Sequence, residues 1–356
     1  MAATHTLSTF RYEASSNTFI KKSVERALRP NEIKIQVTHS GVCYTDVHAK
    51  DKACGLGHEG VGVVATIGDN VTSMKLGDRV GWGWLRSSCG NCSVCVDGYR
   101  QYCAQASGFA FCDHEQGAFA DFHIIDADFA YHIPPEIPSW QAGVFMCAGA
   151  STYEALDAAG TKPHHRIGVV GLGGLGHMAV LFAKAMGCVV TVFSGSFGRA
   201  ESKAEDAFKL GADELRTLSD IDTTLRPGRS EYLSAGGNET QSVSLVDVLL
   251  VCCNETPDLE KILPFLARRA TIVLMSIQQK PLVVPYMPFI LPGHKIVAST
   301  EASRQNHLAM IQFAARHKIS PWVERFPMTE DGLKSAFERL ENGEMRFRGV
   351  LEVPGA

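Results

Sequence analysis

The sequence has little that would direct the chain to a membrane or to nucleic acid. None of its apolar runs approaches the ~18–20 residues that span a bilayer, and residues 1–10 lack the basic and then apolar pattern of a signal peptide. The formal net charge is −4, so no basic field would recruit nucleic acid or anionic lipid. We therefore expect a cytoplasmic protein without a nucleic-acid or membrane partner.

Internal repeats, low-complexity tracts and flexible linkers are also missing from the sequence. Domains usually run to ~100–200 residues, so the 356 residues predict two of them. Apolar residues make up 45% of the chain and charged ones 20%, which is ordinary for a globular protein with buried cores. In a reducing cytoplasm, the 11 cysteines are expected to bind metal, carry chemistry or pack in cores.

The first 140 residues are predicted to form an antiparallel, barrel-like domain. Residues 32–37 alternate polar and apolar side chains, which is typical of a half-buried strand. Residues 61–67 are a β-branched run, and glycines and prolines interrupt the rest.

From about Cys147 onwards, strands are predicted to alternate with helices. Such alternation indicates a parallel, doubly wound sheet. Gly187 stops one of these helices at the place where a C-cap is expected. The predicted strands are 167–170, 189–193, 246–252 and 271–275, and the predicted helices are 151–159, 178–186 and 258–267.

The last part of the chain is predicted to return to the first domain. Residues 307–316 and 331–340 have helical patterns, and 349–353 is a final strand. We expect a discontinuous domain of residues 1–150 and 289–356, and a second domain of residues 151–288. Within the second, the polar residues 217–245 are predicted to be a surface excursion.

Four cysteines follow one another in a C-x2-C-x2-C-x7-C array. A structural zinc site needs four soft ligands in a closed tetrahedron, and thiolates suit it. Gly90 and Gly98 supply the backbone freedom that a tight ligand loop requires. Disulfides, scattered core cysteines or an iron–sulfur cluster are the alternatives. The four are Cys89, Cys92, Cys95 and Cys103.

Three further fragments are weak signals alone, because a lone histidine or cysteine is more often a packed core residue. They are Gly-Val-Cys-Tyr-Thr-Asp-Val-His at 41–48, Gly-His-Glu-Gly at 57–60 and Met-Cys-Ala-Gly at 146–149. Together, and in this order, they resemble the zinc alcohol dehydrogenase branch of the medium-chain dehydrogenase/reductase superfamily. Cinnamyl alcohol dehydrogenase-like and yeast-type members are the most similar, and the resemblance runs over essentially the whole chain.

The resemblance implies an α/β fold with two parts, a β-rich GroES-like catalytic domain and a Rossmann-type nucleotide-binding domain. It also implies that Cys43, His58 and Cys147 bind a catalytic zinc, which makes two zinc ions per chain. Three protein ligands leave a fourth position open, as a catalytic zinc site requires. Zinc in such a site acts as a Lewis acid on an aldehyde or alcohol.

Further roles follow from the resemblance alone. Glu59 matches a residue near the metal that can enter its coordination sphere, and Asp46 matches the carboxylate that orients His58. Thr45 matches a hydroxyl that hydrogen-bonds the substrate oxygen. His48 matches a histidine that ends a proton relay to solvent. The alternatives are a plain loop hydroxyl for Thr45 and a surface side chain for His48.

The chain departs from the family between Cys43 and His58, where other members carry several more residues. Here residues 50–54 run almost straight into the Gly-His-Glu motif. That loop normally lines the substrate cleft, so the family's substrates do not transfer to this chain by analogy.

A glycine-rich sequence follows the strand at 167–170 and opens the next helix. It fits G-x-G-x-x-G, whose glycines allow a tight turn, close approach of a pyrophosphate and helix–strand packing. The helix N-terminus adds free N–H groups and partial positive charge. A glycine-rich turn without a ligand is the alternative. The residues are Gly171, Leu172, Gly173, Gly174, Leu175 and Gly176.

The end of the second strand of this domain predicts NADP(H) rather than NAD(H). An NAD enzyme normally carries Asp or Glu there, ~20 residues after the glycines. Here Ser194 and Ser196 stand in that place with Arg199 just beyond, and they could bind a 2′-phosphate. Glu201 is the counter-argument, although it should lie a turn into the next helix. By the resemblance, Arg348 contacts the cofactor pyrophosphate; a solvated surface charge is the alternative.

These features predict a zinc-dependent alcohol dehydrogenase or aldehyde reductase that transfers hydride between NADP(H) and an aldehyde or primary alcohol, with reduction the expected direction. Trp82, Trp84, Phe109 and Phe111 hint at aromatic or bulky substrates, although core positions are slightly favoured for them. Reduction of iminium or conjugated C=C bonds is the alternative, and a non-catalytic descendant is a further one. The resemblance implies a homo-oligomer, a dimer or tetramer formed through the nucleotide-domain sheet.

Overall fold

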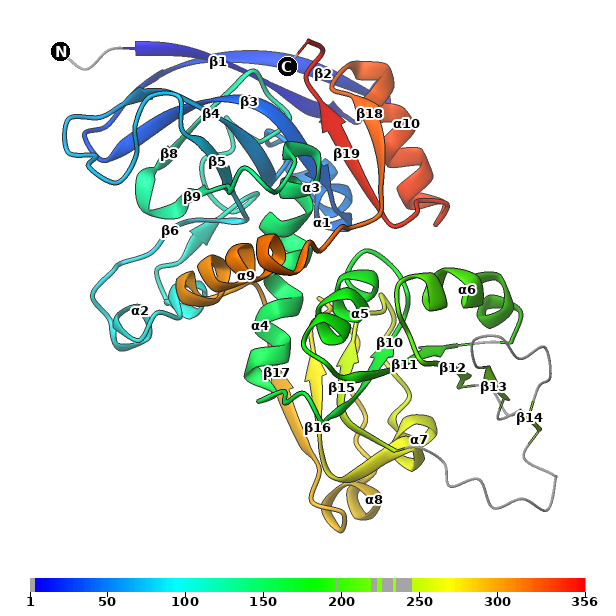
Figure 1. The fold of residues 1–356 in the computed structure, drawn as a ribbon. Helices are drawn as coiled ribbons and strands as arrows, with labels where there is room; N and C mark the ends of the chain where they lie inside the picture. Colours follow the sequence, from blue (N-terminus) through cyan, green and yellow to red (C-terminus); the bar gives the residue numbers. More distant parts are fainter. Residues whose placement is uncertain (1–3, 196, 219–222, 226–232, 235–244, 356) are drawn as a thin grey trace. The chain divides into compact units, whose positions relative to one another are not determined.

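The structure is a computed structural model that describes residues 4–195, 197–218, 223–225, 233–234 and 245–355. Its contacts divide the chain into two compact units (Figure 1). The first comprises Met1–Ala150 and Glu301–Ala356, and the second comprises Ser151–Thr300. Among the described residues, no helix combines the length and the apolar character needed to cross a membrane.

The first unit is built on a seven-stranded sheet, mostly antiparallel, with β8 paired to β3 beside the main order β18-β19-β3-β4-β5-β9. Ile33, Ile35 and Val37 alternate along β3 and are buried, as the sequence pattern predicted. The strands are β3 (Glu32–Val42), β4 (Glu59–Ile67), β5 (Arg79–Trp82), β8 (Phe122–Asp126), β9 (Tyr131–His132), β18 (Val323–Pro327) and β19 (Arg348–Glu352).

Short helices and two small hairpins complete this unit. The hairpins pair β1 (Thr4–Glu13) with β2 (Thr18–Ala27), and β6 (Leu85–Ser87) with β7 (Ser107–Gly108). A π-helical turn, η4, interrupts the step from α3 to the next helix, and such turns are frequent at functional sites. The helices are α1 (Tyr44–His48), η1 (Lys50–Lys52), α2 (Ser93–Val96), η2 (Arg100–Tyr102), η3 (Ala127–Phe129), α3 (Ser139–Val144), η4 (Phe145–Gly149), α9 (Arg304–His317) and α10 (Glu330–Glu341).

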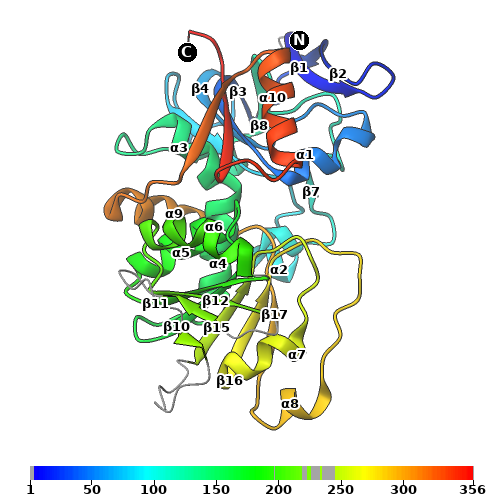
Figure 2. The same ribbon diagram turned by 90° about the vertical axis from the view of Figure 1, so that its right-hand side faces the viewer.

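The second unit is built on an eight-stranded sheet in the order β14-β13-β12-β11-β10-β15-β16-β17. From β12 to β17 the strands are parallel, and Figure 2 shows β10, β15 and β16 side by side. The chain reverses its direction of travel across the sheet between β10 and β15, which is where doubly wound folds bind ligands. The strands are β10 (Arg166–Val170), β11 (Val189–Ser194), β12 (Glu214–Thr217), β13 (Thr223–Leu225), β14 (Leu233–Ser234), β15 (Val246–Val251), β16 (Leu266–Leu274) and β17 (Lys295–Ala298).

The helices of this unit connect the parallel strands, as a doubly wound sheet requires. Both units thus confirm the predicted α/β fold, a β-rich part and a Rossmann-type part. The helices are α4 (Ala150–Ala158), α5 (Gly176–Ala185), α6 (Phe197–Lys209), α7 (Leu259–Ile262), η5 (Leu263–Phe265) and α8 (Tyr286–Ile290).

Two local predictions differ from the structure. The helix predicted at 258–267 is a single turn, α7, followed by η5, because Pro264 lacks an N–H and β16 already begins at Leu266. The return to the first unit comes at Glu301 rather than at residue 289. The reason is that β17 pairs with β16 and extends the parallel sheet. Most of the predicted excursion at 217–245 lies outside the described residues.

Candidate active site

Asp46 is the buried carboxylate around which the first cluster is arranged. It lies in α1, and the backbone N–H of Cys43 donates to its Oδ2 at 2.9 Å. The N–H of Gly57 donates to its Oδ1 at 3.1 Å, and His58 Nδ1 lies at the same distance from that oxygen. A carboxylate can only accept, so His58 carries its proton on Nδ1. In the neutral imidazole, Nε2 therefore presents its lone pair on the side of the ring that faces away from Asp46.

Sulfur, nitrogen and oxygen atoms that could bind a metal come together beside His58 from three separate segments of the chain. The candidate ligand atoms of Cys43, His58, Glu59 and Cys147 all lie within 4.8 Å of one another. Cys43 lies between β3 and α1, His58 and Glu59 stand at the start of β4, and Cys147 lies in η4. Two thiols and an imidazole are a donor set that fits zinc. The structure therefore brings together the three residues predicted to bind the catalytic metal.

The pKa values of these side chains are shifted because the groups crowd one another in a buried cluster. The neighbouring Cys147 thiol, more than any other group, lowers the pKa of Cys43 well below its ordinary value. Burial opposes protonation of His58, but Asp46 outweighs it and raises the pKa of that imidazole. The same cluster raises the pKa of Cys147, first through its hydrogen bond with Cys43. A metal binding here would displace protons from the sulfurs and compensate their charge.

Glu59 and Arg348 form a buried ion pair beside the cluster. Arg348 Nη1 donates to Glu59 Oε1 at 2.9 Å, and both residues are buried. Burial raises the pKa of Glu59 to about 8, although Arg348 opposes the rise. Glu59 Oε2 is buried without a hydrogen-bond partner, and Gly41 leaves room for it, since a Cβ there would stand 1.9 Å away. An orphaned oxygen at this place fits a residue that can approach a metal.

This pairing corrects one reading of Arg348. The arginine is buried, so the alternative of a solvated surface charge is wrong. Its contact with a cofactor pyrophosphate stays a prediction.

Thr45 and His48 lie on α1, next to the cluster. The Thr45 hydroxyl oxygen is 3.7 Å from the Cys43 sulfur, and its side chain is partly exposed. His48 is exposed, with its ring packed edge-on against Tyr44. Thr45 thus lies at the cluster and His48 at the surface, three positions further along the same helix.

Two of the four aromatic residues considered as substrate contacts belong to the core. Trp82 is fully buried and stacks on His123, with ring centroids 4.7 Å apart. Phe109 is also fully buried and stacks on His58 at 4.9 Å, so it supports a predicted ligand from behind. Phe111, by contrast, is 68% exposed.

The second cluster is the four-cysteine loop. The sulfurs of Cys89 and Cys95 are 3.9 Å apart, those of Cys92 and Cys103 3.8 Å, and those of Cys103 and Cys89 3.5 Å. A tetrahedron with Zn–S bonds of ~2.3 Å has edges of about 3.8 Å. All 11 cysteines are free thiols, so no disulfide competes for these sulfurs.

The backbone of the loop is shaped for this cluster. Gly90 and Gly98 have φ of +74° and +92°, a region that favours glycine. The N–H of Cys92 donates to the Cys89 sulfur at 3.4 Å. Backbone N–H groups, of Asn91 first and of Cys92, lower the pKa of Cys89 to about 6. Donors aimed at sulfur stabilise the thiolate form that a metal needs.

The glycine loop after β10 fits a dinucleotide. Gly171 has φ of +89°, and a Cβ there would stand 3.0 Å from Cys253. A Cβ at Gly176 would stand 1.9 Å from the Gly171 carbonyl oxygen, so close strand–helix packing needs that glycine. A Cβ at Gly173 would meet nothing within 4 Å, which leaves open space over the backbone. These are the three tasks expected of the predicted fingerprint.

The residues predicted to select the cofactor are only partly described. Ser194 is buried at the end of β11. Ser196 and the side chains of Arg199 and Glu201 lie outside the described part of the chain. Lys203, which the sequence analysis did not single out, donates from Nζ to the Leu172 carbonyl oxygen at 3.2 Å. A further cation therefore stands against the glycine loop.

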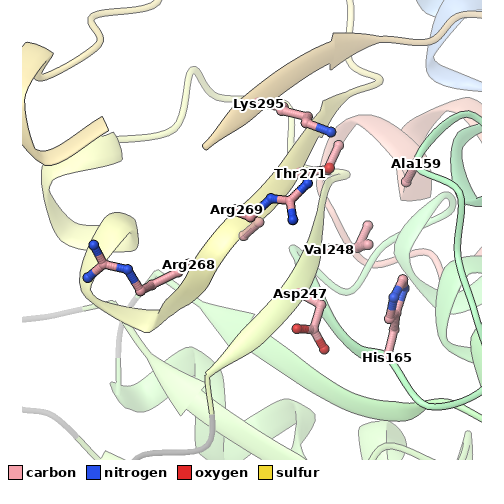
Figure 3. Close-up of a pocket in the computed structure, with 9 residues that line it drawn as sticks. Ala159, His165, Asp247, Val248, Arg268, Arg269, Thr271 and Lys295 are labelled. Atoms are coloured by element: carbon pink, nitrogen blue, oxygen red, sulfur yellow. The ribbon is translucent and has the colours of Figure 1, made fainter. Parts of the chain in front are cut away.

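A cavity of about 330 Å³ lies at the other end of the strands of the eight-stranded sheet, away from the glycine loop. Residues at the beginnings of β15 and β17 line it, and Arg269 and Lys295 lie near Thr271 (Figure 3). Asp247 and His165 also line it. The carboxyl ends of parallel strands are where such folds bind nucleotides. This cavity is at the amino ends and is not the predicted cofactor site.

The sequence analysis also missed one acidic side chain near the first cluster. Glu301 follows β17 and interacts electrostatically with His58 and Cys43. A signal was available, because the residue comes directly after an apolar strand, where the carboxyl end of a parallel strand lies.

Comparisons with known proteins agree with this arrangement. Residues 29–135 match the alcohol dehydrogenase GroES-like domain, and residues 174–316 match the zinc-binding dehydrogenase domain. Cinnamyl alcohol dehydrogenase 8 of Arabidopsis thaliana is 33% identical over 336 residues, covering 90% of this chain and 88% of its own. Mannitol dehydrogenase of Petroselinum crispum is 34% identical over 347 residues, covering 93% and 96%.

Solved structures give the same picture. A cinnamyl alcohol dehydrogenase from Sorghum bicolor has a TM-score of 0.84 at 29% identity, covering 99% of both chains. A cinnamyl alcohol dehydrogenase from Helicobacter pylori, solved with NADP(H), has a TM-score of 0.83 at 22% identity, covering 99% of this chain and 100% of that one, and is similar in fold.

Proposed function

The chain belongs to the family of zinc-binding alcohol dehydrogenases, oxidoreductases of alcohols and aldehydes, and we propose that it reduces an aldehyde to a primary alcohol with NADPH. The observation that supports this most is the convergence of Cys43, His58 and Cys147, drawn from three segments, on one point beside Asp46. A packed core would not need a histidine held in one tautomer by a buried carboxylate.

The chain's own side chains prepare the reacting centre. We assign Cys43, His58 and Cys147 as the residues that hold zinc. When bound there, zinc supplies a Lewis acid that polarises a carbonyl or acidifies an alcohol. Asp46 keeps the proton of His58 on Nδ1, so that Nε2 is free to ligate. Arg348 balances the charge of Glu59 and holds that carboxylate at the edge of the cluster.

A proton path to solvent is proposed along α1. The Thr45 hydroxyl, beside the Cys43 sulfur, is the group that would hydrogen-bond the substrate oxygen. His48, exposed on the same helix, would exchange the proton with water. Positions three apart lie on one face of a helix, which suits a short relay. Such a relay is needed because a buried oxygen has no other route for its proton.

We assign the second zinc to the four-cysteine loop. Four thiol ligands fill a tetrahedron, so no position remains for a substrate and the role is structural. The ligands are Cys89, Cys92, Cys95 and Cys103.

The cofactor is proposed to be NADP(H), with its pyrophosphate over the glycine loop. Ser194, Ser196 and Arg199 would bind the 2′-phosphate, and Lys203 adds a cation near the same loop. β11 ends in Ser194 rather than in a carboxylate, so the residue at the strand end does not repel a phosphate. The solved Helicobacter pylori relative was crystallised with NADP(H). Arg348 is proposed to contact the pyrophosphate.

The substrate is proposed to be a small aldehyde or alcohol. The curated relatives are named for cinnamyl alcohol, which is aromatic, and for mannitol, which is a polyol. The link between Cys43 and His58 is short, with only α1 and η1 in it, and we propose that this gives the chain a substrate preference of its own.

A homodimer formed through the second unit is proposed. β17 ends the eight-stranded sheet, and an unpaired edge strand can pair with a second copy. The segment before it carries exposed apolar side chains, which mark association surfaces. These are Ile277, Val283, Tyr286, Met287 and Leu291, exposed by 56–75%. Replacing Tyr286 with Arg should shift the mass measured by light scattering to that of a monomer.

The cytoplasm is the proposed location. All 11 cysteines are free thiols, and several are partly exposed. Free thiols persist in a reducing compartment. A fluorescent fusion and fractionation would check the location.

An activity screen tests the proposed function. The zinc-loaded chain is assayed with NADPH and NADH on aldehydes, alcohols, imines and conjugated C=C substrates. We expect aldehyde reduction with NADPH to be the fastest reaction. Turnover of imines or C=C bonds alone, or no turnover in protein that carries zinc, would contradict the proposal.

A further inference from the structure

We propose that the cavity at the beginnings of β15 and β17 is a binding site for a small phosphate monoester, held by Arg269, Thr271 and Lys295. The cavity lies wholly within the second unit. None of the residues that line it is assigned above to zinc, substrate or cofactor. A ligand in this cavity would therefore occupy a second binding site of the chain, away from the glycine loop.

Three neighbouring strands form one side of the cavity. Thr271 of β16 pairs with Val248 of β15 and, on its other side, with Lys295 of β17. Side chains alternate between the two faces along each strand, so residues paired in this way share a face. All three line the cavity. The Thr271 hydroxyl and the Lys295 ammonium therefore lie side by side on the same face, as Figure 3 shows.

A bulge in β16 adds a second cation to this face. The register shifts between β15 and β16, where a single residue of β15 lies opposite residues 267–270. Within this segment Arg269 has φ of +65°, a region that non-glycine residues rarely adopt. Its N–H donates to the Pro292 carbonyl oxygen at 2.8 Å, which holds the bulge in place. The guanidinium is thereby directed toward Thr271 and Lys295 (Figure 3).

The two cations lack an anionic partner. In the described part of the chain, the side chains of Arg269 and Lys295 form no ion pair and no hydrogen bond. Asp247 also lines the cavity, but its Oδ2 accepts the N–H of Arg166 at 2.8 Å. In Figure 3 its carboxylate points away from the two cations. A bound anion would relieve the repulsion between like charges that stand close together.

The lining selects a phosphate group in particular. The planar fork of an arginine matches two phosphate oxygens, and a lysine binds phosphate as a point charge. His165, on another side of the cavity, accepts the N–H of Lys162 at Nδ1 over 3.1 Å. Its neutral imidazole therefore carries the proton on Nε2, which adds a further donor. Two cations compensate a phosphate dianion better than they would a single carboxylate.

The size and the remaining lining indicate a small ester. Ligand pockets usually measure ~300–1,000 Å³. The cavity, at about 330 Å³, is at the lower end of that range and does not suit a dinucleotide. Ala159, Val248 and Ala270 supply apolar surface for the organic part of the ligand.

Titration calorimetry of the zinc-loaded chain with phenyl phosphate tests the proposal, with and without saturating NADPH. Benzoate is the second probe, because it carries a carboxylate on the same ring. The variants are Arg269→Asn and Lys295→Met. Asparagine tolerates the left-handed backbone, so Arg269→Asn removes the cation without adding strain. The matched control is Lys318→Asn, since Lys318 is an exposed cation outside the cavity with φ of +53°.

We expect the wild type to bind phenyl phosphate at one site per chain, more tightly than benzoate and equally well with NADPH present. Arg269→Asn and Lys295→Met should each raise the Kd by about ten- to a hundredfold, the usual effect of losing a charge-assisted hydrogen bond. Lys318→Asn should keep the wild-type Kd. The melting temperature without ligand should stay the same in all variants, because both replaced side chains of the cavity are exposed.

A wild type that does not bind phenyl phosphate saturably would overturn the inference. Binding that both cavity variants retain, or that NADPH displaces, would also overturn it, because the ligand would then lie elsewhere. Equal weakening by Lys318→Asn would reduce the effect to general surface charge and contradict the site. Benzoate that binds as tightly as phenyl phosphate would refute the choice of phosphate. Weakening in only one cavity variant would support the site and assign the main contact to that residue.

Discussion

The two cysteine-containing clusters of the first unit differ in how the chain assembles them. The ligands of one lie in a single loop, residues 89–103, held by local N–H···S contacts and two glycines. Those of the other come from residues 43, 58 and 147 and meet only because β3, β4 and η4 pack together. The four-cysteine cluster can therefore be predicted from the spacing of its residues in the sequence, whereas the cluster of Cys43, His58 and Cys147 forms only when the unit folds.

The clusters also differ in their surroundings. Cys89 and Cys92 are partly exposed and receive backbone donors. The cluster of Cys43, His58 and Cys147 is buried with two carboxylates and Arg348. The four-cysteine loop suits a metal that ties a loop together, and the buried cluster suits a metal whose reactivity is tuned by neighbouring charges.

The largest expected effect is the loss of turnover in Cys147→Ala. Removing one of three ligands should lower kcat by at least about a thousandfold, because the Lewis acid is lost. The melting temperature should change little, since the fold does not depend on this metal. Cys188→Ala is the matched control, because Cys188 is also buried but lies in neither cluster. Activity in Cys147→Ala close to that of the control would contradict the assignment.

Cys92→Ser should show the opposite pattern. Structural zinc contributes directly to folding, so the free energy of unfolding should fall by more than about 3 kcal/mol. Thermal and denaturant melts of Cys92→Ser and Cys147→Ala, side by side, measure the difference. Equal losses of stability in the two variants would remove the distinction between the clusters.

Asp46→Asn should weaken the buried cluster alone. The carboxylate holds His58 in one tautomer, and such partners typically contribute 10–100-fold to metal affinity or activity. We expect about that loss of zinc affinity at one site, with the four-cysteine site unchanged. Titration with a chelator, followed by metal analysis, separates the two sites. Parallel loss of both metals would show that the substitution had damaged the fold.

Arg199→Ala should leave both clusters intact and change only the cofactor. An Arg–phosphate contact is worth about 1.5–3 kcal/mol, so the KM for NADPH should rise by roughly ten- to a hundredfold. NADH has no phosphate to lose, and its kinetics should stay nearly the same. Steady-state kinetics with both cofactors decide this. A wild type that prefers NADH, or equal damage to both cofactors, would refute the NADP(H) assignment.

Sequence reasoning reached the parts of the site that depend on local chemistry. The four-cysteine spacing and the glycine fingerprint were readable because neighbouring residues form each of them. The Glu59–Arg348 ion pair joins residues 289 positions apart, and no local pattern encodes it. The return of the chain to the first unit was predicted at residue 289 instead of Glu301, because β17 is a short strand that follows the exposed helix α8.

Zinc analysis of the purified chain tests the account most directly. Protein prepared without chelator should contain two zinc ions per chain, and Cys147→Ala and the refolded Cys92→Ser should each contain one. A wild type with one zinc or fewer, or a Cys147→Ala variant that still holds two, would contradict the claim that these two clusters are distinct zinc sites.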